Sequence, residues 1–81
     1  MSALPRLTIY SRRGCHLCED LLGELEALLR GRAGLDVVDI DTDALLRTRY
    51  NERVPVVCAG ELMLCQFRLD RAAVLAWLEN A

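Results

Sequence analysis

The sequence contains no lysine and few aromatic residues, and these absences argue against several classes of partner. Its ten basic residues are all arginines, scattered along 81 residues and outnumbered by twelve acids, for a net charge of -2. Aromatic residues make up only 5% of the chain, too few for a set of stacking rings. Proteins that bind nucleic acids usually gather basic charge on one face. We therefore expect no nucleic-acid partner and no attraction to an anionic membrane surface.

Long apolar runs are lacking as well. No stretch approaches the roughly 18 apolar residues that a transmembrane helix requires. The first residues, MSALPRLTIYSRRG, lack the basic start, long apolar stretch and small-residue cleavage site of a signal peptide. We therefore expect a cytoplasmic protein, whose four cysteines would not form a disulfide framework in a reducing environment. A content of 53% hydrophobic residues is enough for one domain spanning 1–81, without metal or disulfide to hold it together.

The first half of the chain has the pattern of a strand, a helix and a second strand. The short β-forming run Leu7–Tyr10 is followed by a loop that ends at Gly14. Between Leu17 and Leu29, apolar residues recur every three or four positions, which predicts a helix with one buried face. The β-branched run 35–41, LDVVDID, is apolar enough to predict an interior strand.

The second half predicts a short helix, a hairpin and a final helix. Residues 41–43 supply a cap for the two-turn helix 44–50. Residues 54–65, VPVVCAGELMLC, form two apolar runs around a turn, which is typical of a hairpin. Asp70 is expected to cap the last, amphipathic helix. Because two strands joined by a helix usually lie parallel, the pattern predicts an α/β fold with a small mixed sheet.

The C-x-x-C pair of Cys15 and Cys18 lies where the first strand gives way to the first helix. Unpaired amide groups at a helix start carry partial positive charge and stabilise an anion there. Helix N-termini and nearby cations lower the pKa of a cysteine from ~8.5 into a range of about 3.5–7.5. The nearby cations are Arg12, Arg13 and His16, so we expect Cys15 to be the reactive thiolate.

Cys18 has the opposite expected environment. It falls on the same apolar stripe as Leu21 and Leu25, so its sulfur is expected to be buried and protonated. An exposed thiolate one turn from a buried thiol suits two-step thiol exchange. Cys15 would attack a target disulfide, and Cys18 would then resolve the mixed disulfide.

Three explanations of the pair remain open: a redox dithiol, half of a metal or iron–sulfur site, and merely structural cysteines. A metal site needs two further ligands, and Cys58 and Cys65 are the available thiols. With Gly60-Glu61 as the hairpin turn, Cys58 pairs with Met63 and Val56 with Cys65, which makes the two cysteines diagonal neighbours in the core. That position is typical of core filling. We favour the redox dithiol and predict no metal ligand, because C-x-x-C at such a junction is typical of thioredoxin-like proteins.

These segments resemble a known family. LTIYSRRGCHLCED, LDVVDID, ERVPVVCAGELML and a closing capped helix resemble a glutaredoxin-like protein of the thioredoxin fold over nearly the whole chain. The similarity is greatest to the small bacterial glutaredoxin-like proteins. It implies that Cys15 is the nucleophile and Cys18 the resolving cysteine. It also implies a cis-proline loop at Val54-Pro55 that pairs with bound peptide or glutathione, and a third strand antiparallel to the first in a four-stranded sheet flanked by helices.

The sequence departs from ordinary glutaredoxins around the glutathione site. His16 and Leu17 replace the usual proline and aromatic residue between the cysteines, Arg53 replaces a threonine, and CQFRLDRA lacks the Gly-Gly turn. Asp70 corresponds to a glutathione-binding acid, but helix capping is its simpler role. We consider Arg53 and Arg68 as alternative receivers of a substrate carboxylate.

The resulting hypothesis is a monomeric thiol–disulfide oxidoreductase that reduces protein or small-molecule disulfides. We expect no bound cofactor and an external thiol donor, either glutathione or a thioredoxin-type reductase system. The alternatives are a metal or iron–sulfur carrier, and a non-catalytic interaction module whose cysteines are vestigial. Bound metal would identify the carrier, and ordinary thiol pKa values without reductase activity would identify the module.

Overall fold

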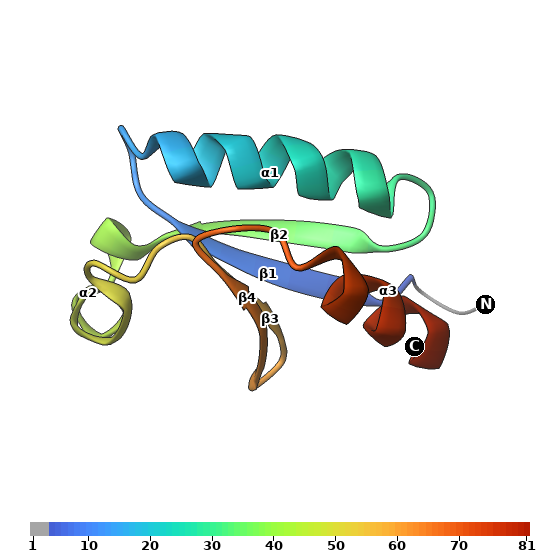
Figure 1. Ribbon diagram of the computed structural model, residues 1–81. Coiled ribbons are helices and arrows are strands. Elements are labelled where there is room, and N and C mark those ends of the chain that lie inside the picture. The colour runs from blue at the N-terminus through green and yellow to red at the C-terminus, as the bar shows by residue number, and fades with distance from the viewer. Residues whose placement is uncertain (1–3) are drawn as a thin grey trace.

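Four strands form one mixed sheet in the order β2-β1-β3-β4 in the computed structural model, which describes residues 4–81 (Figure 1). β1 pairs in parallel with β2 and antiparallel with β3, and β4 lies antiparallel to β3. The strands are β1 Arg6–Ser11, β2 Gly34–Asp39, β3 Val56–Ala59 and β4 Leu62–Gln66. The helices are α1 His16–Leu29, α2 Ala44–Tyr50 and α3 Arg71–Asn80, with a short 3-10 helix, η1 Ile40–Thr42, before α2. The thioredoxin-like α/β order expected from the sequence is confirmed, including the antiparallel third strand.

The described residues begin inside the expected domain. The segment considered as a signal peptide in the sequence begins with residues 1–3, and these three residues lie outside the described part of the chain. Within residues 4–81, no helix is both long enough and apolar enough to cross a membrane.

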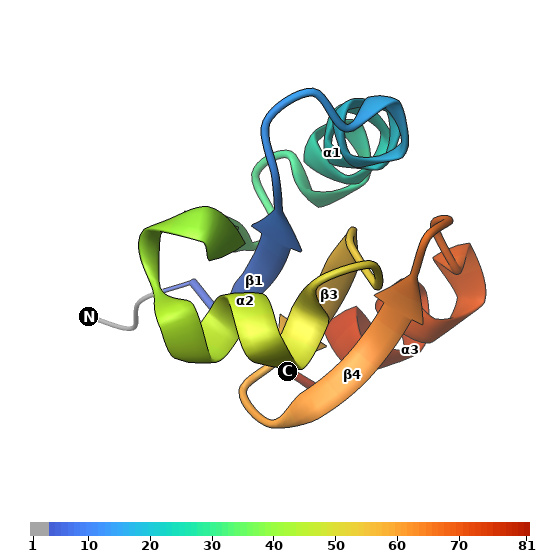
Figure 2. The same ribbon diagram turned by 90° about the vertical axis from the view of Figure 1, so that its left-hand side faces the viewer.

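The helices lie on both sides of the sheet. Figure 2 shows α1 and α3 on one side and α2 on the other. The main core fills the space between the sheet and the helices α1 and α3; its buried members are Leu7, Ile9, Leu21, Leu25, Leu29, Val57, Cys65 and Val74. Burying this apolar surface is the main stabilising term of the fold. The loop that carries Cys15 leaves this packed sheet at the carboxyl end of β1.

β2 differs from the strand expected over 35–41 in both position and length. It lies at an edge of the sheet, and its Val37 side chain is 54% exposed, so the interior strand was a wrong prediction. It also ends at Asp39, whose side chain accepts the backbone N–H of Asp41 at 2.9 Å. The hydroxyl of Thr42 donates to the backbone carbonyl of Asp39 at 2.7 Å. These local bonds turn the chain into η1, because they compete with continued strand pairing.

The hairpin of β3 and β4 has a different register from the one expected. Cys58 lies opposite Met63 as predicted, but Cys65 lies opposite Val57 and not Val56. A bulge between Val57 and Cys58 shifts the pairing by one residue. Successive strand residues point to opposite faces, so Cys58 and Cys65 lie on opposite sides of the sheet. The expectation that they are diagonal neighbours was therefore wrong, although both are buried as expected.

Aspartates begin the two later α-helices, as the sequence indicated. The Asp43 carboxylate accepts the backbone N–H of Leu45 at 2.8 Å at the start of α2. The Asp70 carboxylate accepts the backbone N–H of Ala73 at 3.0 Å at the start of α3. Both capping predictions are confirmed, and each satisfies an amide that the helix itself leaves unpaired.

Candidate active site

Cys15 lies at the junction of β1 and α1. The chain leaves β1 at Ser11 and turns at Gly14, whose φ of 73° lies in the left-handed region that favours glycine. Cys15 then adopts an extended conformation and caps α1. Its Sγ accepts the backbone N–H of Cys18 at 3.1 Å. The sulfur therefore occupies the position that serine or aspartate takes in an ordinary N-cap, at the positive end of the helix dipole.

The two cysteines are close together but unequally exposed. The Cα atoms of Cys15 and Cys18 lie 5.2 Å apart, and their sulfurs are joined as a disulfide. Cys15 is half-buried, whereas Cys18 is only 4% exposed. The predicted difference in burial is confirmed. An approaching disulfide can reach Cys15, while Cys18 lies behind it within reach of the same sulfur.

The segment before β3 lies against the dithiol. The Val54-Pro55 peptide bond is cis, as the family resemblance implied. Val54 is 9% exposed and packs with Cys18 and Ile40 in a small apolar cluster that Cys15 also contacts. This cluster brings together the start of α1, the turn after β2 and the proline loop.

Two tyrosines border the same cluster on the α2 side of the sheet. The ring of Tyr10 stacks on that of Tyr50, with centroids 4.5 Å apart and planes at 22°. The guanidinium carbon of Arg49 lies 6.0 Å from the centre of the Tyr50 ring. Desolvation raises the pKa of Tyr10, so its hydroxyl stays neutral around pH 7. The pair therefore serves packing beside the site.

Arg12 ties the active-site loop to the segments on either side of α2. Its Nε and Nη2 donate to the carboxylate of Asp41 at 2.9 and 2.8 Å. Its Nη1 donates to the backbone carbonyl of Asn51 at 3.0 Å. The Arg12 guanidinium also holds the pKa of Asp41 below its ordinary value, chiefly through these hydrogen bonds. We call Arg12 with Asp41 and Asn51 the Arg12 clamp. The positive charge of Arg12 is paired with the Asp41 carboxylate.

The other expected cations face solvent. Arg13 is exposed and makes no hydrogen bond or ion pair within the part of the chain that the structure describes. His16 begins α1 with a side chain 96% exposed, and its Nδ1 lies 3.8 Å from a carboxylate oxygen of Glu19. Arg53 is exposed as well, and its backbone carbonyl accepts Nε2 of Gln66 at 3.5 Å. Stabilisation of the thiolate by Arg13 or His16 stays a prediction.

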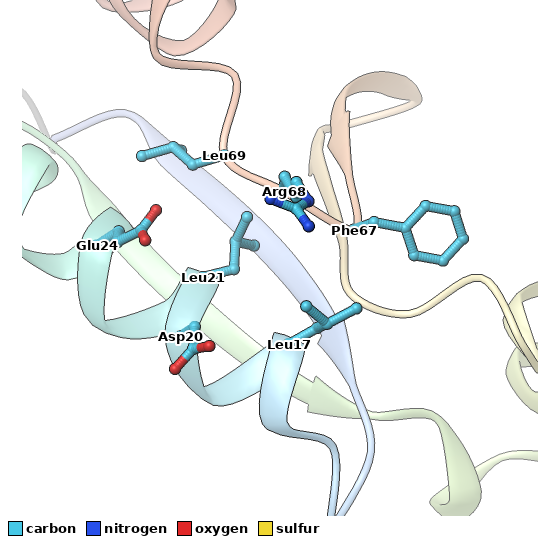
Figure 3. A pocket seen from close by; sticks show the side chains of 7 residues that line it. All are labelled: Leu17, Asp20, Leu21, Glu24, Phe67, Arg68 and Leu69. Carbon is cyan, nitrogen blue, oxygen red and sulfur yellow. The ribbon is translucent and has the colours of Figure 1, made fainter.

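An open pocket of about 380 Å³ lies beside the dithiol, between α1 and the segment 67–69 that leads into α3 (Figure 3). Leu17, the residue directly before Cys18, lines it and is 44% exposed, so the expectation that Leu17 joins the buried stripe of α1 was wrong. Phe67 lies at the end of the pocket near Leu17 and is 42% exposed. We call this pocket the α1 groove; its lining residues are Leu17, Asp20, Leu21, Glu24, Phe67, Arg68 and Leu69.

The remaining cysteines are removed from this chemistry. Cys58 and Cys65 are 5% and 4% exposed, and desolvation raises the pKa of both thiols. Both therefore remain protonated at neutral pH. Residues 4–81 contain no group of three or more His, Cys, Asp or Glu side chains placed to hold a metal ion.

Two features of the site were missed by sequence reasoning. Asp41 was considered only as a helix cap, and its bidentate partner Arg12 lies 29 residues away, so no local pattern indicated the pair. Phe67 was noted only as part of a segment without Gly-Gly. The signal was Phe67 itself, which stands in the segment where the resemblance to ordinary glutaredoxins implies a Gly-Gly turn.

The fold and the site together define a thioredoxin-fold protein with a C-x-x-C pair at the start of its first helix and a cis-proline beside it. Residues 6–79 match the family described as Glutaredoxin-like domain (DUF836), and the chain belongs to this family. Its membership and the closeness of Cys15 to Cys18 fit a thiol redox role.

Solved structures of similar proteins agree with this assignment. The solution structure of protein Ne2328 from Nitrosomonas europaea is 35% identical, covers 95% of this chain and 94% of its own, and superposes with a TM-score of 0.81. The X-ray structure of protein XcR50 from X. campestris is 39% identical over 93% of this chain and 97% of its own, with a TM-score of 0.67. Among curated proteins, no significant match to this chain was found.

Proposed function

We propose that this protein is a thiol–disulfide oxidoreductase that reduces disulfides of proteins or small molecules in the cytoplasm. The observation that carries the proposal is the unequal pair at the start of α1. Cys15 is half-buried and accepts a helix amide, while Cys18 is buried one turn behind it. A hydrogen bond from a backbone amide favours the thiolate, which is the reactive form, over the thiol.

The reaction proceeds in two exchanges. The Cys15 thiolate attacks one sulfur of the substrate disulfide, forms a mixed disulfide and releases the other substrate sulfur as a thiolate. Cys18 then loses its proton and attacks Sγ of Cys15. The Cys15–Cys18 disulfide forms, and the second substrate thiolate leaves. Two electrons pass from the protein dithiol to the substrate, and the released thiolates take protons from water.

An external thiol returns the two electrons and restores the dithiol. Glutathione and a thioredoxin-type reductase system are the candidate donors, and the protein acts as a monomer without a bound cofactor. Glutathione would require receivers for its carboxylates, for which Arg53 and Arg68 are the candidates, both exposed. If Arg53→Ala and Arg68→Ala leave glutathione-dependent turnover unchanged, neither arginine receives such a carboxylate.

Thiol trapping with mass mapping across a series of glutathione redox buffers tests the proposal. We expect one disulfide, between Cys15 and Cys18, with a midpoint potential between about −270 mV and about −200 mV, the values of thioredoxin and the glutaredoxins. A transient adduct of Cys15 with glutathione would identify the donor. The proposal fails if both cysteines stay reduced, or if they titrate only after bound metal has been removed.

A further inference from the structure

Phe67 occupies a strained turn beside the active site. Its φ of 68° lies in the left-handed region, which bulky residues rarely adopt. The backbone N–H of Arg68 donates to the carbonyl of Gln66 at 2.7 Å, which closes a three-residue turn around Phe67. Turns of this kind with positive φ at the centre are rare and strained. Such strain persists where the surroundings enforce it, and it gathers at functional sites.

A second hydrogen bond anchors this turn to the proline loop. The backbone N–H of Phe67 donates to the carbonyl of Pro55 at 2.8 Å. The Phe67 side chain is 42% exposed at the end of the α1 groove where Leu17 lies, and its ring points outward from the other lining side chains (Figure 3). Leu17 and Leu21 point from α1 toward the segment 67–69 in the same view. The groove therefore has an apolar end directly beside the dithiol.

The wall of the groove that α1 forms is acidic. Asp20 and Glu24 line it, are exposed, and make no ion pair among residues 4–81. The whole of α1 carries four carboxylates and no arginine or lysine. On the opposite side, Arg68 supplies one positive charge. The groove thus repels a ligand with excess negative charge near α1 and attracts a basic one.

We propose that the α1 groove docks an extended segment of a disulfide-bearing protein, with an apolar side chain against Leu17 and Phe67 and a basic side chain against Asp20 and Glu24. The inference rests on the proposed function and adds the class of its substrate. Glutathione fits this wall poorly, because it carries two carboxylates and a single ammonium group. Phe67 is accordingly a specificity-determining residue, and the acidic pair selects the neighbouring residue.

A competition for Cys15 measures this selectivity directly. The protein carries Cys18→Ser, so that a mixed disulfide at Cys15 accumulates. Two peptides of different mass each contain a cysteine activated as a thionitrobenzoate disulfide and flanked by leucine, followed by arginine in one and glutamate in the other. The Cys15 thiolate attacks the peptide sulfur, the old disulfide breaks, and thionitrobenzoate leaves as a thiolate. Mass spectrometry then gives the ratio of the two adducts.

The charge arm of the test uses matched variants on one helix. We expect the arginine peptide to be preferred by roughly three- to tenfold at low salt, the range expected for two exposed charge pairs, and by less at high salt. The double variant Asp20→Asn with Glu24→Gln should bring the ratio close to one. Glu26→Gln, which removes a carboxylate of α1 that does not line the groove, should keep the preference.

The apolar arm uses peptides that carry leucine or serine beside the cysteine. Phe67→Gly should lower the preference for leucine roughly threefold or more, because the ring surface is lost. Glycine suits the backbone angle at this position, and Phe67→Asn is a second variant that tolerates it. Leu62→Ala removes an apolar side chain that is 60% exposed on β4, outside the groove, and should leave the preference unchanged.

The outcomes separate this inference from the function on which it rests. Absence of any adduct at Cys15 would overturn the proposed function and this inference with it. Adducts without selectivity, or selectivity that survives the Asp20 and Glu24 changes, would overturn the groove proposal alone. If the same changes weaken the reaction with the thionitrobenzoate disulfide of glutathione instead, the groove is a glutathione site and the proposal is wrong.

Discussion

The hydrogen bond from the Cys18 backbone to the Cys15 sulfur leads to a prediction about stability as well as reactivity. It makes Cys15 the N-cap of α1. Serine at this position retains an acceptor for the same amide, whereas alanine leaves the amide unpaired. Cys15→Ser and Cys15→Ala both lack the disulfide and the nucleophile, so the difference between them isolates the cap.

The expected difference in stability between the two variants is that of one capping hydrogen bond. Replacing a good N-cap by alanine typically lowers the free energy of unfolding by about 1 kcal/mol, within a range of roughly 0.5–2 kcal/mol. For a domain of this length, 1 kcal/mol corresponds to a shift in Tm of about 4–8 °C. We therefore expect Cys15→Ala to melt several degrees below Cys15→Ser, with both inactive.

The assay is thermal and urea denaturation followed by circular dichroism, with a reductant present throughout. The pair Asp70→Asn and Asp70→Ala provides the control at the N-cap of α3, where the carboxylate accepts the Ala73 amide at 3.0 Å and no redox chemistry is involved. Suppose that the two Asp70 variants differ in Tm and in the free energy of unfolding, whereas the two Cys15 variants do not. The side chain of residue 15 would then contribute no capping bond to α1. The argument that α1 favours the Cys15 thiolate would be refuted with it.

Three further predictions concern the clamp, the resolving step and the buried thiols. Arg12→Ala should lower kcat/KM for disulfide reduction about tenfold by loosening the loop. Arg6→Ala breaks a second bidentate pair, between Arg6 on β1 and Asp36 on β2, and should change kcat/KM less than twofold. Cys18→Ser should still react with a disulfide but accumulate the mixed disulfide by mass, and normal multiple turnover with a protein disulfide would contradict the dithiol mechanism. In reduced native protein at pH 7, iodoacetamide should spare Cys58 and Cys65, because burial raises the pKa of both thiols. Labelling of these two cysteines should appear only when the protein unfolds or at much higher pH. Equal labelling of all four cysteines would contradict their burial.

Parts of the site with local causes could be predicted from residues close together in sequence. The cap at Asp70 depends on one carboxylate and an amide three residues on, and the periodic leucines of α1 depend on helical geometry alone. The junction of β1 and α1 followed from a strand pattern ending just before Cys15. The difference in burial between Cys15 and Cys18 followed from the same helical periodicity.

Other expectations failed where long-range contacts override local pattern. The run 35–41 is apolar enough for the middle of a sheet, yet β2 lies at its edge, because position in a sheet depends on which strands pair. The pairing of Val56 with Cys65 assumed a regular hairpin, and a bulge between Val57 and Cys58 shifted it. A bulge depends on how both strands pack, which the turn sequence does not encode.

The sequence by itself determined the order of elements, the helix caps and the position of the C-x-x-C pair, because each depends on residues within about one turn of one another. Only the tertiary structure decided which groups surround that pair. Arg12 meets Asp41 across 29 residues, and the amide of Phe67 meets the carbonyl of Pro55 at the open end of the β3–β4 hairpin. Such contacts form when packing brings distant segments together, so both the Arg12 clamp and the α1 groove are properties of the folded chain.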